Sequence, residues 1–188
     1  MTHLTLLLAR HGETDLNSAE RWQGRIDAPL NAAGLAQAQR LADELPAGIG
    51  AIVASPMQRA RQTAEPAAAR LGLPIAFDAD FRERDFGVFD GLTEAEAAAQ
   101  FPELAARNAA YRWDLEPPGA EPTRDVVGRV ARGLQRLRER HAGQTVLLVS
   151  HGFVVRCLRH LIDGVPEAEF FTAARIPNGH FLTRTLAP

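Results

Sequence analysis

Two short apolar runs, each ending in a histidine and a glycine, constrain the fold of this chain more than any other feature. The run at 4–9 leads through Arg10 to His11, and the run at 145–150 leads directly to His151. Short apolar runs bounded by polar residues are typical of buried parallel strands, and ligands bind at the carboxyl ends of such strands. The sequence therefore predicts one site that contains both histidines. The glycine after each histidine is expected to leave the backbone free to turn sharply and to approach a ligand closely.

The rest of the chain alternates between strand and helix patterns. Asn31 is expected to cap a helix that reaches Leu45, and Ser55 followed by Pro56 is expected to open a helix that reaches about Leu71. The other predicted elements are strands at 51–54, 74–77 and 179–186, and helices at 93–100, 103–113, 126–143 and 153–162. Such alternation favours an α/β fold with a mostly parallel sheet covered on both faces.

Length and charge limit the class of protein. With 188 residues, 46% hydrophobic and 23% charged, the chain is expected to form one domain over 1–188. A formal net charge of −2 predicts neither a nucleic-acid nor a membrane-surface partner. A single cysteine excludes an internal disulfide, and the short apolar start lacks the basic region of a signal peptide. We expect a cytoplasmic protein, and a homo-oligomer is compatible with the sequence.

All 21 basic residues are arginines, because the chain contains no lysine. This excludes a Walker-type lysine and a Schiff-base lysine. A general arginine excess also follows from a GC-rich gene, so only arginines within motifs indicate anion binding.

Arg10 and His11 together indicate a nucleophile beside an anion clamp. A neutral imidazole is nucleophilic near neutral pH, and a guanidinium binds phosphate oxygens in pairs. Arg59 is predicted to face the same crevice from the next helix, whereas Arg61, two residues further on, is predicted to be solvated.

A run of charged residues at 82–85 offers a general acid. Cleavage of a phosphoester with a poor leaving group needs a proton donor at the bridging oxygen, and either Glu83 or Asp85 could serve. A solvated charge cluster is the alternative. A zinc site made of His11, His151 and Glu83 is a further alternative, but the arginines beside the histidines disfavour a cation there.

These motifs, taken together, resemble the histidine phosphatase superfamily, in the branch that also contains cofactor-dependent phosphoglycerate mutases. They follow the order of that family from residue 4 to about 180. The motifs that carry the resemblance are Leu8 to Thr14, Gln23-Gly24, Asp27 to Leu30, Ser55-Pro56, Arg59-Ala60, Gln62 to Ala64, Glu83, Phe86-Gly87, Gly91 and Val149 to Gly152.

The resemblance implies a three-layer α/β/α fold of the phosphoglycerate mutase type and a reaction without metal or cofactor. It implies that His11 is phosphorylated during turnover and that Glu83, rather than Asp85, donates and accepts the proton. The residues implied to hold the phosphoryl group are Arg10, Arg59 and His151, with Asn17, Gln23 and the backbone of Gly24 and Gly152 nearby.

The predicted function is that of a histidine acid or neutral phosphatase, a phosphoric monoester hydrolase acting on a small phosphorylated substrate. The interval from Glu83 to His151 is too short for the extra segment of the glycolytic mutases, which favours hydrolysis over the mutase alternative. A phospholigand-binding module without catalysis is the alternative from another class. The loop at 117–122 departs from the family pattern, so sugar phosphates, phosphoglycerate, nucleotides and a cobalamin precursor all stay open as substrates.

Some remaining residues invite simpler interpretations. The aromatic residues Trp22, Tyr111 and Trp113 are candidates for the pocket wall, with packing as the default. Cys157 lies in an apolar helical pattern and is predicted to be a core thiol.

Overall fold

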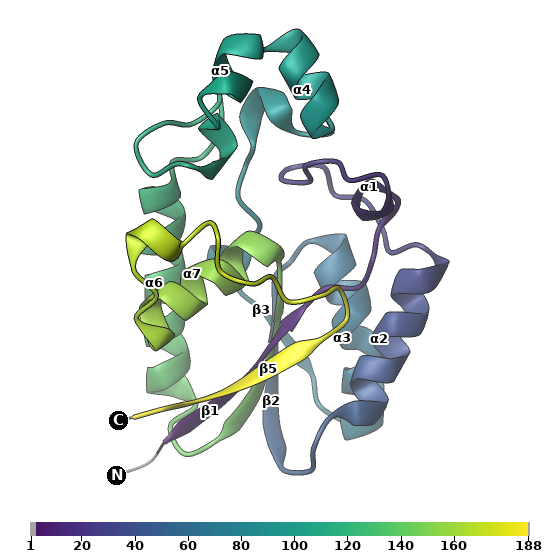
Figure 1. Ribbon diagram of the computed structural model, residues 1–188. Helices are drawn as coiled ribbons and strands as arrows, with labels where there is room; N and C mark the ends of the chain where they lie inside the picture. Colours follow the sequence, from purple (N-terminus) through teal and green to yellow (C-terminus); the bar gives the residue numbers. More distant parts are fainter. Residues whose placement is uncertain (1–2, 188) are drawn as a thin grey trace.

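A five-stranded sheet forms the centre of the computed structural model, which describes residues 3–187 (Figure 1). The strand order is β3-β2-β4-β1-β5. Neighbouring strands pair in parallel except β1 and β5, so the predicted mostly parallel sheet is confirmed. The strands are β1 (Leu4–Arg10), β2 (Ile49–Ala54), β3 (Ile75–Phe77), β4 (Thr145–Ser150) and β5 (Phe181–Leu186).

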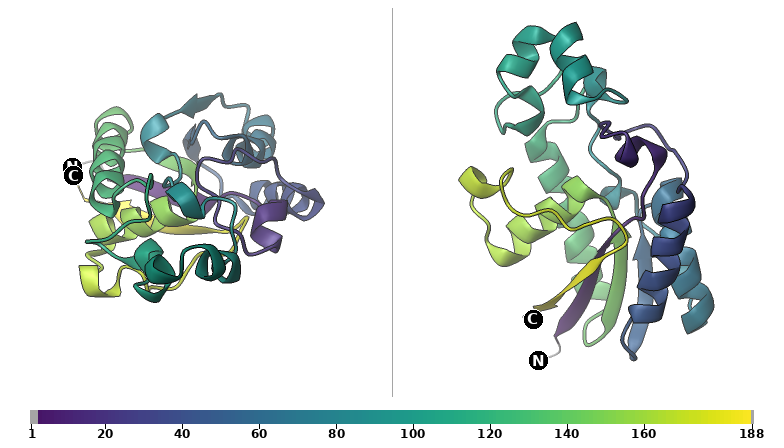
Figure 2. Two further views of the ribbon diagram at one scale, coloured as in Figure 1. Left: turned by 90° about the horizontal axis from the view of Figure 1, so that it is seen from above. Right: turned by 45° about the vertical axis from the view of Figure 1, so that its right-hand side comes forward.

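Helices cover both faces of the sheet, which confirms the three-layer arrangement (Figures 1 and 2). One face carries α2 (Ala32–Glu44) and α3 (Gln58–Leu71), and the other carries α6 (Thr123–Arg140) and α7 (Gly152–Asp163).

The two cores on either side of the sheet follow from the alternation of side chains along β1. Leu6 and Leu8 are buried against the α6 and α7 side, whereas Leu7 and Ala9 are buried against the α2 and α3 side. Successive side chains of a strand point to opposite faces, so an uninterrupted apolar run fills both cores. This double burial explains why the run at 4–9 contains hardly any polar residue.

Residues 87–111, here called the cap, rise above the carboxyl edge of the sheet (Figures 1 and 2). The cap contains α4 (Glu94–Gln100), α5 (Pro102–Ala106) and the short 3₁₀ helices η2 (Gly87–Phe89) and η3 (Ala109–Tyr111). Outside it lie the short helices α1 (Asp15–Ser18), η1 (Ala79–Phe81) and η4 (Glu167–Glu169).

Two predicted helices differ from the structure. The helix expected over 103–113 ends at Ala106, because Asn108 adopts the left-handed conformation at a φ of 51°, which asparagine tolerates better than most residues. The helix expected to open at Ser55 begins at Gln58, with Met57 in the capping position and no side-chain cap. The Ser55 hydroxyl contacts His151 instead.

Neither Gly12 nor Gly152 has a positive φ, so the conformation that only glycine adopts readily is not what these positions require. Gly12 is needed for packing: a Cβ there would lie 2.5 Å from the carbonyl oxygen of Gly34 in α2. The absence of a side chain lets the segment after β1 pass close to the start of that helix.

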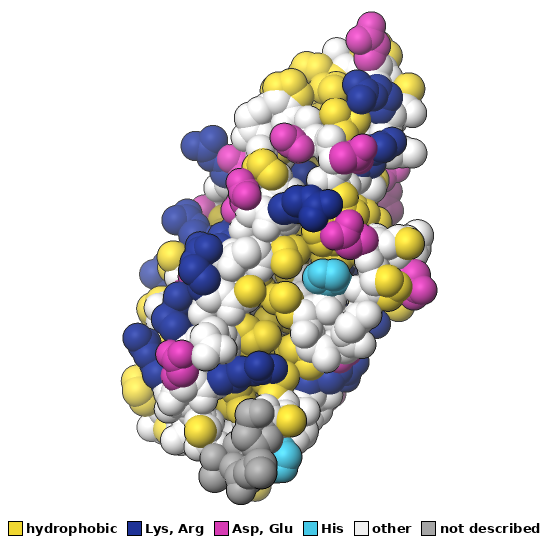
Figure 3. Space-filling view, turned by 90° about the vertical axis from the view of Figure 1, so that its left-hand side faces the viewer, with side chains coloured by type: hydrophobic (Ala, Val, Ile, Leu, Met, Phe, Trp, Pro, Cys, Tyr) yellow, Lys and Arg dark blue, Asp and Glu magenta, His cyan; other side chains and the backbone are white. Residues whose placement is uncertain are grey.

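The face over α6 and α7 shows arginine side chains along one edge, with carboxylates and apolar groups among them (Figure 3). Some of these charges are paired. Arg136 of α6, for example, contacts both Asp78 and Asp80. No helix within residues 3–187 has both the length and the apolar character needed to cross a bilayer.

Two glycines of α6 should respond in opposite ways to replacement by alanine. A Cβ at Gly133 would lie 2.7 Å from the buried Phe81 ring, whereas a Cβ at Gly128 would have no atom of residues 3–187 within 4 Å apart from its own helix backbone. We expect Gly133→Ala to lower the free energy of unfolding by about 1–3 kcal/mol. Gly128→Ala should raise it by up to about 1 kcal/mol, because alanine favours the helix. Urea unfolding measures both, and equal effects would contradict this packing.

Candidate active site

The parallel pairing of β1 with β4 brings the two predicted histidines together. Arg10 at the end of β1 is in register with Ser150 at the end of β4, and the next residue of each strand is a histidine. The ring centroids of His11 and His151 lie 5.2 Å apart. This distance confirms that the two histidines meet at one edge of the sheet, where both side chains are buried.

The His11 ring is held in one tautomer by the backbone of the next residue. Its Nδ1 lies 2.7 Å from the carbonyl oxygen of Gly12, which can only accept a proton, so Nδ1 is the donor and a neutral ring leaves Nε2 unprotonated. Burial, followed by the charges of Arg59 and Arg10, holds the pKa of His11 well below its ordinary value. His11 is therefore an uncharged imidazole with a free lone pair at neutral pH.

His151 is oriented by a hydroxyl. Its Nε2 lies 2.7 Å from the Ser55 hydroxyl, which also accepts a hydrogen bond from the Met57 N–H. A neutral ring that accepts the Ser55 proton at Nε2 carries its own proton on Nδ1, which is buried and has no partner in residues 3–187. Burial, then nearby cations, lowers the pKa of His151 well below its ordinary value.

Arg10 extends into the site with one of its guanidinium N–H groups lacking a hydrogen-bond partner. Nη1 donates to the carbonyl oxygen of Ile176 at 3.1 Å, while the buried Nε has no partner within residues 3–187. Burial lowers the pKa of Arg10, and the charge of Glu83 opposes that shift. An unsatisfied, buried guanidinium donor next to a cavity is suited to bind an anion.

Arg59 does not line the cavity, although its charge acts on both histidines. Its guanidinium is buried and donates to the carbonyl oxygens of Ile26, Gln23 and Gly24 at 3.0–3.4 Å. Arg59 therefore fixes the loop beside α1 and adds a positive charge to the site. Arg61, by contrast, points to solvent with half of its side chain exposed.

The predicted polar residues of the loop after His11 differ in their placement. Asn17 and Gln23 line the cavity, and the Asn17 side-chain oxygen accepts from the Thr14 N–H, which leaves its NH₂ group available. Gly24 does not line the cavity, and its N–H donates to Asp90 at 2.5 Å. The predicted backbone contact from Gly24 to phosphate is thus not the geometry found.

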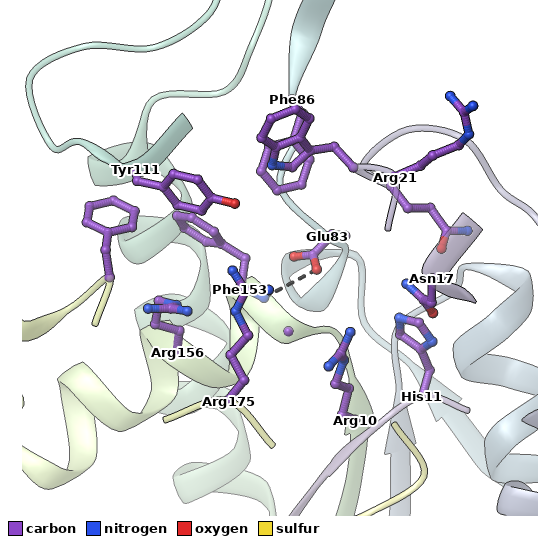
Figure 4. A pocket seen from close by; sticks show the side chains of 14 residues that line it. Arg10, His11, Asn17, Arg21, Glu83, Phe86, Tyr111, Phe153, Arg156 and Arg175 are labelled. Atoms are coloured by element: carbon purple, nitrogen blue, oxygen red, sulfur yellow. Dashed lines mark hydrogen bonds between the residues drawn. The ribbon is translucent and has the colours of Figure 1, made fainter. Parts of the chain in front are cut away.

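Glu83 faces Arg10 across the cavity, and two backbone groups hold its carboxylate (Figure 4). Its oxygens accept from the N–H groups of Arg84 and Phe153 at 3.0 and 3.2 Å. Burial nevertheless raises the pKa of Glu83, against the opposing effects of Arg59 and these N–H groups. A raised pKa keeps a carboxyl group protonated closer to neutral pH, as a general acid requires.

Asp85 is directed away from this cavity. One of its oxygens accepts from the Gly87 N–H at 2.9 Å, and the other lies 3.4 Å from Arg25. The geometry therefore agrees with Glu83, not Asp85, as the carboxyl group of the site.

Gly152 marks the opening between the cation and the acid. A Cβ at this position would lie 3.6 Å from Nε of Arg10 and 4.0 Å from Oε2 of Glu83. The missing side chain thus leaves room for a small group between them.

Several residues besides those predicted line the cavity, and all of them except Phe86 lie outside the sequence motifs. The cavity has a volume of about 130 Å³. Of the three aromatic candidates, Trp22 and Tyr111 line it, whereas Trp113 packs against Phe170 with ring centroids 4.8 Å apart. The additional lining residues are Arg21, Phe86, Phe153, Arg156, Phe171 and Arg175 (Figure 4).

Arg84 connects the cap to the acid. Its buried guanidinium donates to the carbonyl oxygens of Ala110 and Glu121 at 2.9 Å and lies over the Phe153 ring at 4.9 Å. Because Arg84 follows Glu83 directly, this contact fixes the acid relative to Tyr111 and the rest of the cap. Cys157 is buried in the core behind it, and burial raises the pKa of its thiol.

No group of three or more His, Cys, Asp or Glu side chains between residues 3 and 187 is arranged to hold a metal ion. His11, His151 and Glu83 therefore do not form the zinc ligand set considered above.

The chain matches the histidine phosphatase superfamily (branch 1) over residues 6–183 and belongs to that family. A bifunctional protein of Mycobacterium tuberculosis is 43% identical over 166 residues, which cover 85% of this chain and 44% of that protein. The chain thus spans less than half the length of that relative. Phosphoglycerate mutase-like protein 4 of Arabidopsis thaliana is 37% identical over 157 residues, which cover 81% of this chain and 68% of that protein.

Solved structures with phosphatase names share the fold. A mycobacterial glucosyl-3-phosphoglycerate phosphatase complexed with VO3 matches with a TM-score of 0.84 at 28% identity, covering 97% of this chain and 92% of that chain. The alpha-ribazole phosphatase from Shigella flexneri matches with a TM-score of 0.85 at 27% identity, covering 95% and 89%. Phosphatase and mutase names therefore both occur among the proteins to which the chain is similar.

The lowered pKa of His11 should make the folded protein sensitive to acid. Below about pH 6.5 the unfolded chain binds a proton at this histidine and the folded protein does not, so stability falls as the pH drops. Between pH 7.5 and 5.0, the wild type should lose about 1–2 kcal/mol more unfolding free energy than His11→Gln, measured by urea unfolding.

The matched control is His3→Gln, because His3 is exposed ahead of β1. This variant should keep the pH dependence of the wild type. An identical pH dependence in His11→Gln would show that His11 titrates normally in the folded protein.

Proposed function

We propose that this chain is a metal-independent phosphomonoesterase that forms a phosphohistidine on His11. The observation that carries the proposal is a neutral imidazole with a free Nε2, lining the cavity that also holds Arg10 and Glu83. The phosphatase names among the relatives support hydrolysis of phosphate esters. The single domain over 1–188, the cytoplasmic location and the homo-oligomer stay predictions.

In the first step, Nε2 of His11 attacks the phosphorus atom and the bond to the ester oxygen breaks. Glu83 gives its proton to the departing oxygen, and the alcohol leaves. Charge on the equatorial oxygens is stabilised by Arg10 and the Nδ1–H of His151, together with the charge of Arg59. These groups are fixed before reaction, which makes them effective in a water-poor site.

In the second step, Glu83 acts as a base. Its carboxylate takes a proton from water, whose oxygen attacks phosphorus as the bond to Nε2 breaks. Inorganic phosphate leaves, and both His11 and protonated Glu83 are restored. Burial of Glu83 suits both steps, because a pKa nearer to neutral lets one carboxyl group give and take a proton.

A phosphoglycerate mutase is the second candidate, since relatives with mutase names match the chain. It would use the same phosphohistidine but return the phosphoryl group to a second hydroxyl. The short interval between Glu83 and His151 favours hydrolysis. A phospholigand-binding module without catalysis is less well supported, because binding alone does not require the nucleophilic Nε2 of His11.

Replacing His11 should abolish turnover while metal removal should not. We expect His11→Ala to lose at least about 10³-fold in kcat for p-nitrophenyl phosphate, because the nucleophile is gone. The wild type should keep its activity in excess EDTA and be inhibited by vanadate, since arginines neutralise the charge. Phosphate release with and without EDTA is the measurement.

The control for charge neutralisation is Arg61→Ala, which should change activity far less than Arg59→Ala because only Arg59 is buried at the site. Loss of activity in EDTA and recovery with zinc would overturn the proposal. Rapid isomerisation of 3-phosphoglycerate, primed with 2,3-bisphosphoglycerate and releasing little phosphate, would identify a mutase.

Replacing Glu83 should affect alkyl esters more than aryl esters, because a nitrophenolate leaves without a proton and an alkoxide does not. We expect Glu83→Gln to slow phosphorylation of His11 by about 10²–10⁴-fold for an alkyl phosphate and much less for p-nitrophenyl phosphate. The variant also lacks the base for the second step. With the aryl ester it should therefore show a burst and accumulate acid-labile phosphohistidine in rapid-quench experiments.

Asp85→Asn is the matched control, since Asp85 points away from the cavity. It should show neither the selective loss nor the burst. Equal slowing of both esters by Glu83→Gln would remove the acid role from this residue.

A further inference from the structure

The cavity carries more positive charge than one phosphate group can neutralise. Arg156 and Arg175 line the cavity together with Arg10, and none of the three has a carboxylate within 4.0 Å among residues 3–187. Arg21, on the same wall, is different because both of its terminal nitrogens contact Glu96. Arg156 and Arg175 lie beside each other, across the cavity from His11 (Figure 4).

The positive charges of the two arginines are not compensated by a carboxylate within residues 3–187. Arg156 donates one hydrogen bond to the carbonyl oxygen of Phe170, and the Arg175 side chain lies beside the hydroxyl of Tyr111, a neutral partner. Burial and then the charge of Arg175 lower the pKa of Arg156, and Arg175 also contributes to the lowered pKa of Arg10. Cations that repel one another and have unused donors are stabilised by an anion placed between them.

The charges can be counted against the proposed reaction. A phosphate dianion at His11 is matched by the cations of Arg10 and Arg59. Glu83 is neutral when it carries the proton that it donates. The charges of Arg156 and Arg175 are therefore left for a second group of the substrate.

The wall between the two positions is aromatic. Tyr111 and Phe171 meet edge to face with ring centroids 6.2 Å apart, and Phe153 lies 6.1 Å from Phe171. All three rings line the same cavity. Such a wall accommodates the apolar body or ring of a ligand, while the arginines at its end hold a polar group.

We propose that Arg156 and Arg175 form a second anion subsite, so that the substrate is a phosphate monoester with a second anionic group on a ring or apolar body. The second group is a carboxylate or another phosphoryl group, since both match a guanidinium pair. This inference rests on the proposed function, because it assigns the substrate class of the same site.

The test compares esters that differ only in charge. The pairs are 4-carboxyphenyl with 4-carbamoylphenyl phosphate and the corresponding 3-substituted pair, in which acid and amide have nearly the same shape. In at least one pair, the wild type should prefer the acid by about five- to tenfold in kcat/KM, mainly through KM. A phenyl phosphate with a second phosphate ester on the ring, compared with the acids, tells a phosphoryl group from a carboxylate.

The variant Arg175→Ala should bring the acid-to-amide ratio of kcat/KM close to one. Arg107→Ala is the matched control, because Arg107 is an exposed arginine of the cap outside the cavity, and it should keep the ratio of the wild type. Added salt should also reduce the preference of the wild type, since Arg175 is exposed.

The outcomes separate this inference from the proposed function. Equal use of acid and amide in every pair, or a ratio unchanged in Arg175→Ala, overturns the second subsite and leaves hydrolysis intact. Absence of phosphate release from all of these esters and from p-nitrophenyl phosphate overturns the proposed function itself.

Discussion

The burial of ionisable groups at the carboxyl edge of the sheet is the constraint on which the site depends. Removal from water disfavours the charged form of every group. For His11 this lowers the pKa, and for Glu83 it raises the pKa. One physical cause thus shifts both groups towards their uncharged forms, which is the direction that acid-assisted nucleophilic attack needs.

Backbone groups from separate segments keep these side chains in place. The Gly12 carbonyl fixes the tautomer of His11, and the N–H groups of residues 84 and 153 hold the carboxylate of Glu83. Arg84 then ties this carboxylate to the cap through carbonyl oxygens. Because backbone donors and acceptors do not titrate or change rotamer, the site keeps its geometry as the proton moves.

The sequence predicts the sheet and the meeting of the histidines, because burial of β1 on both faces leaves a plain apolar run in the chain. It fails where tertiary contacts override local preference. The need for glycine at position 12 comes from Gly34, and the N–H of Gly24 is taken by Asp90, contacts that only the folded chain defines. The position of Arg175 depends on a loop far from the histidines in the chain, so no local spacing indicates it.

The last strand completes the site from the opposite end of the chain. The segment that leads into β5 supplies the Ile176 carbonyl to Arg10 and the Asn178 amide to the His11 carbonyl. β5 then pairs with β1, which is made first. During synthesis on the ribosome, β1, β2 and β4 emerge before this segment, and long-range strand pairing forms slowly. A nascent chain that already contains His11, Glu83 and His151 therefore still lacks the contacts that fix Arg10, and the site is complete only when β5 has docked.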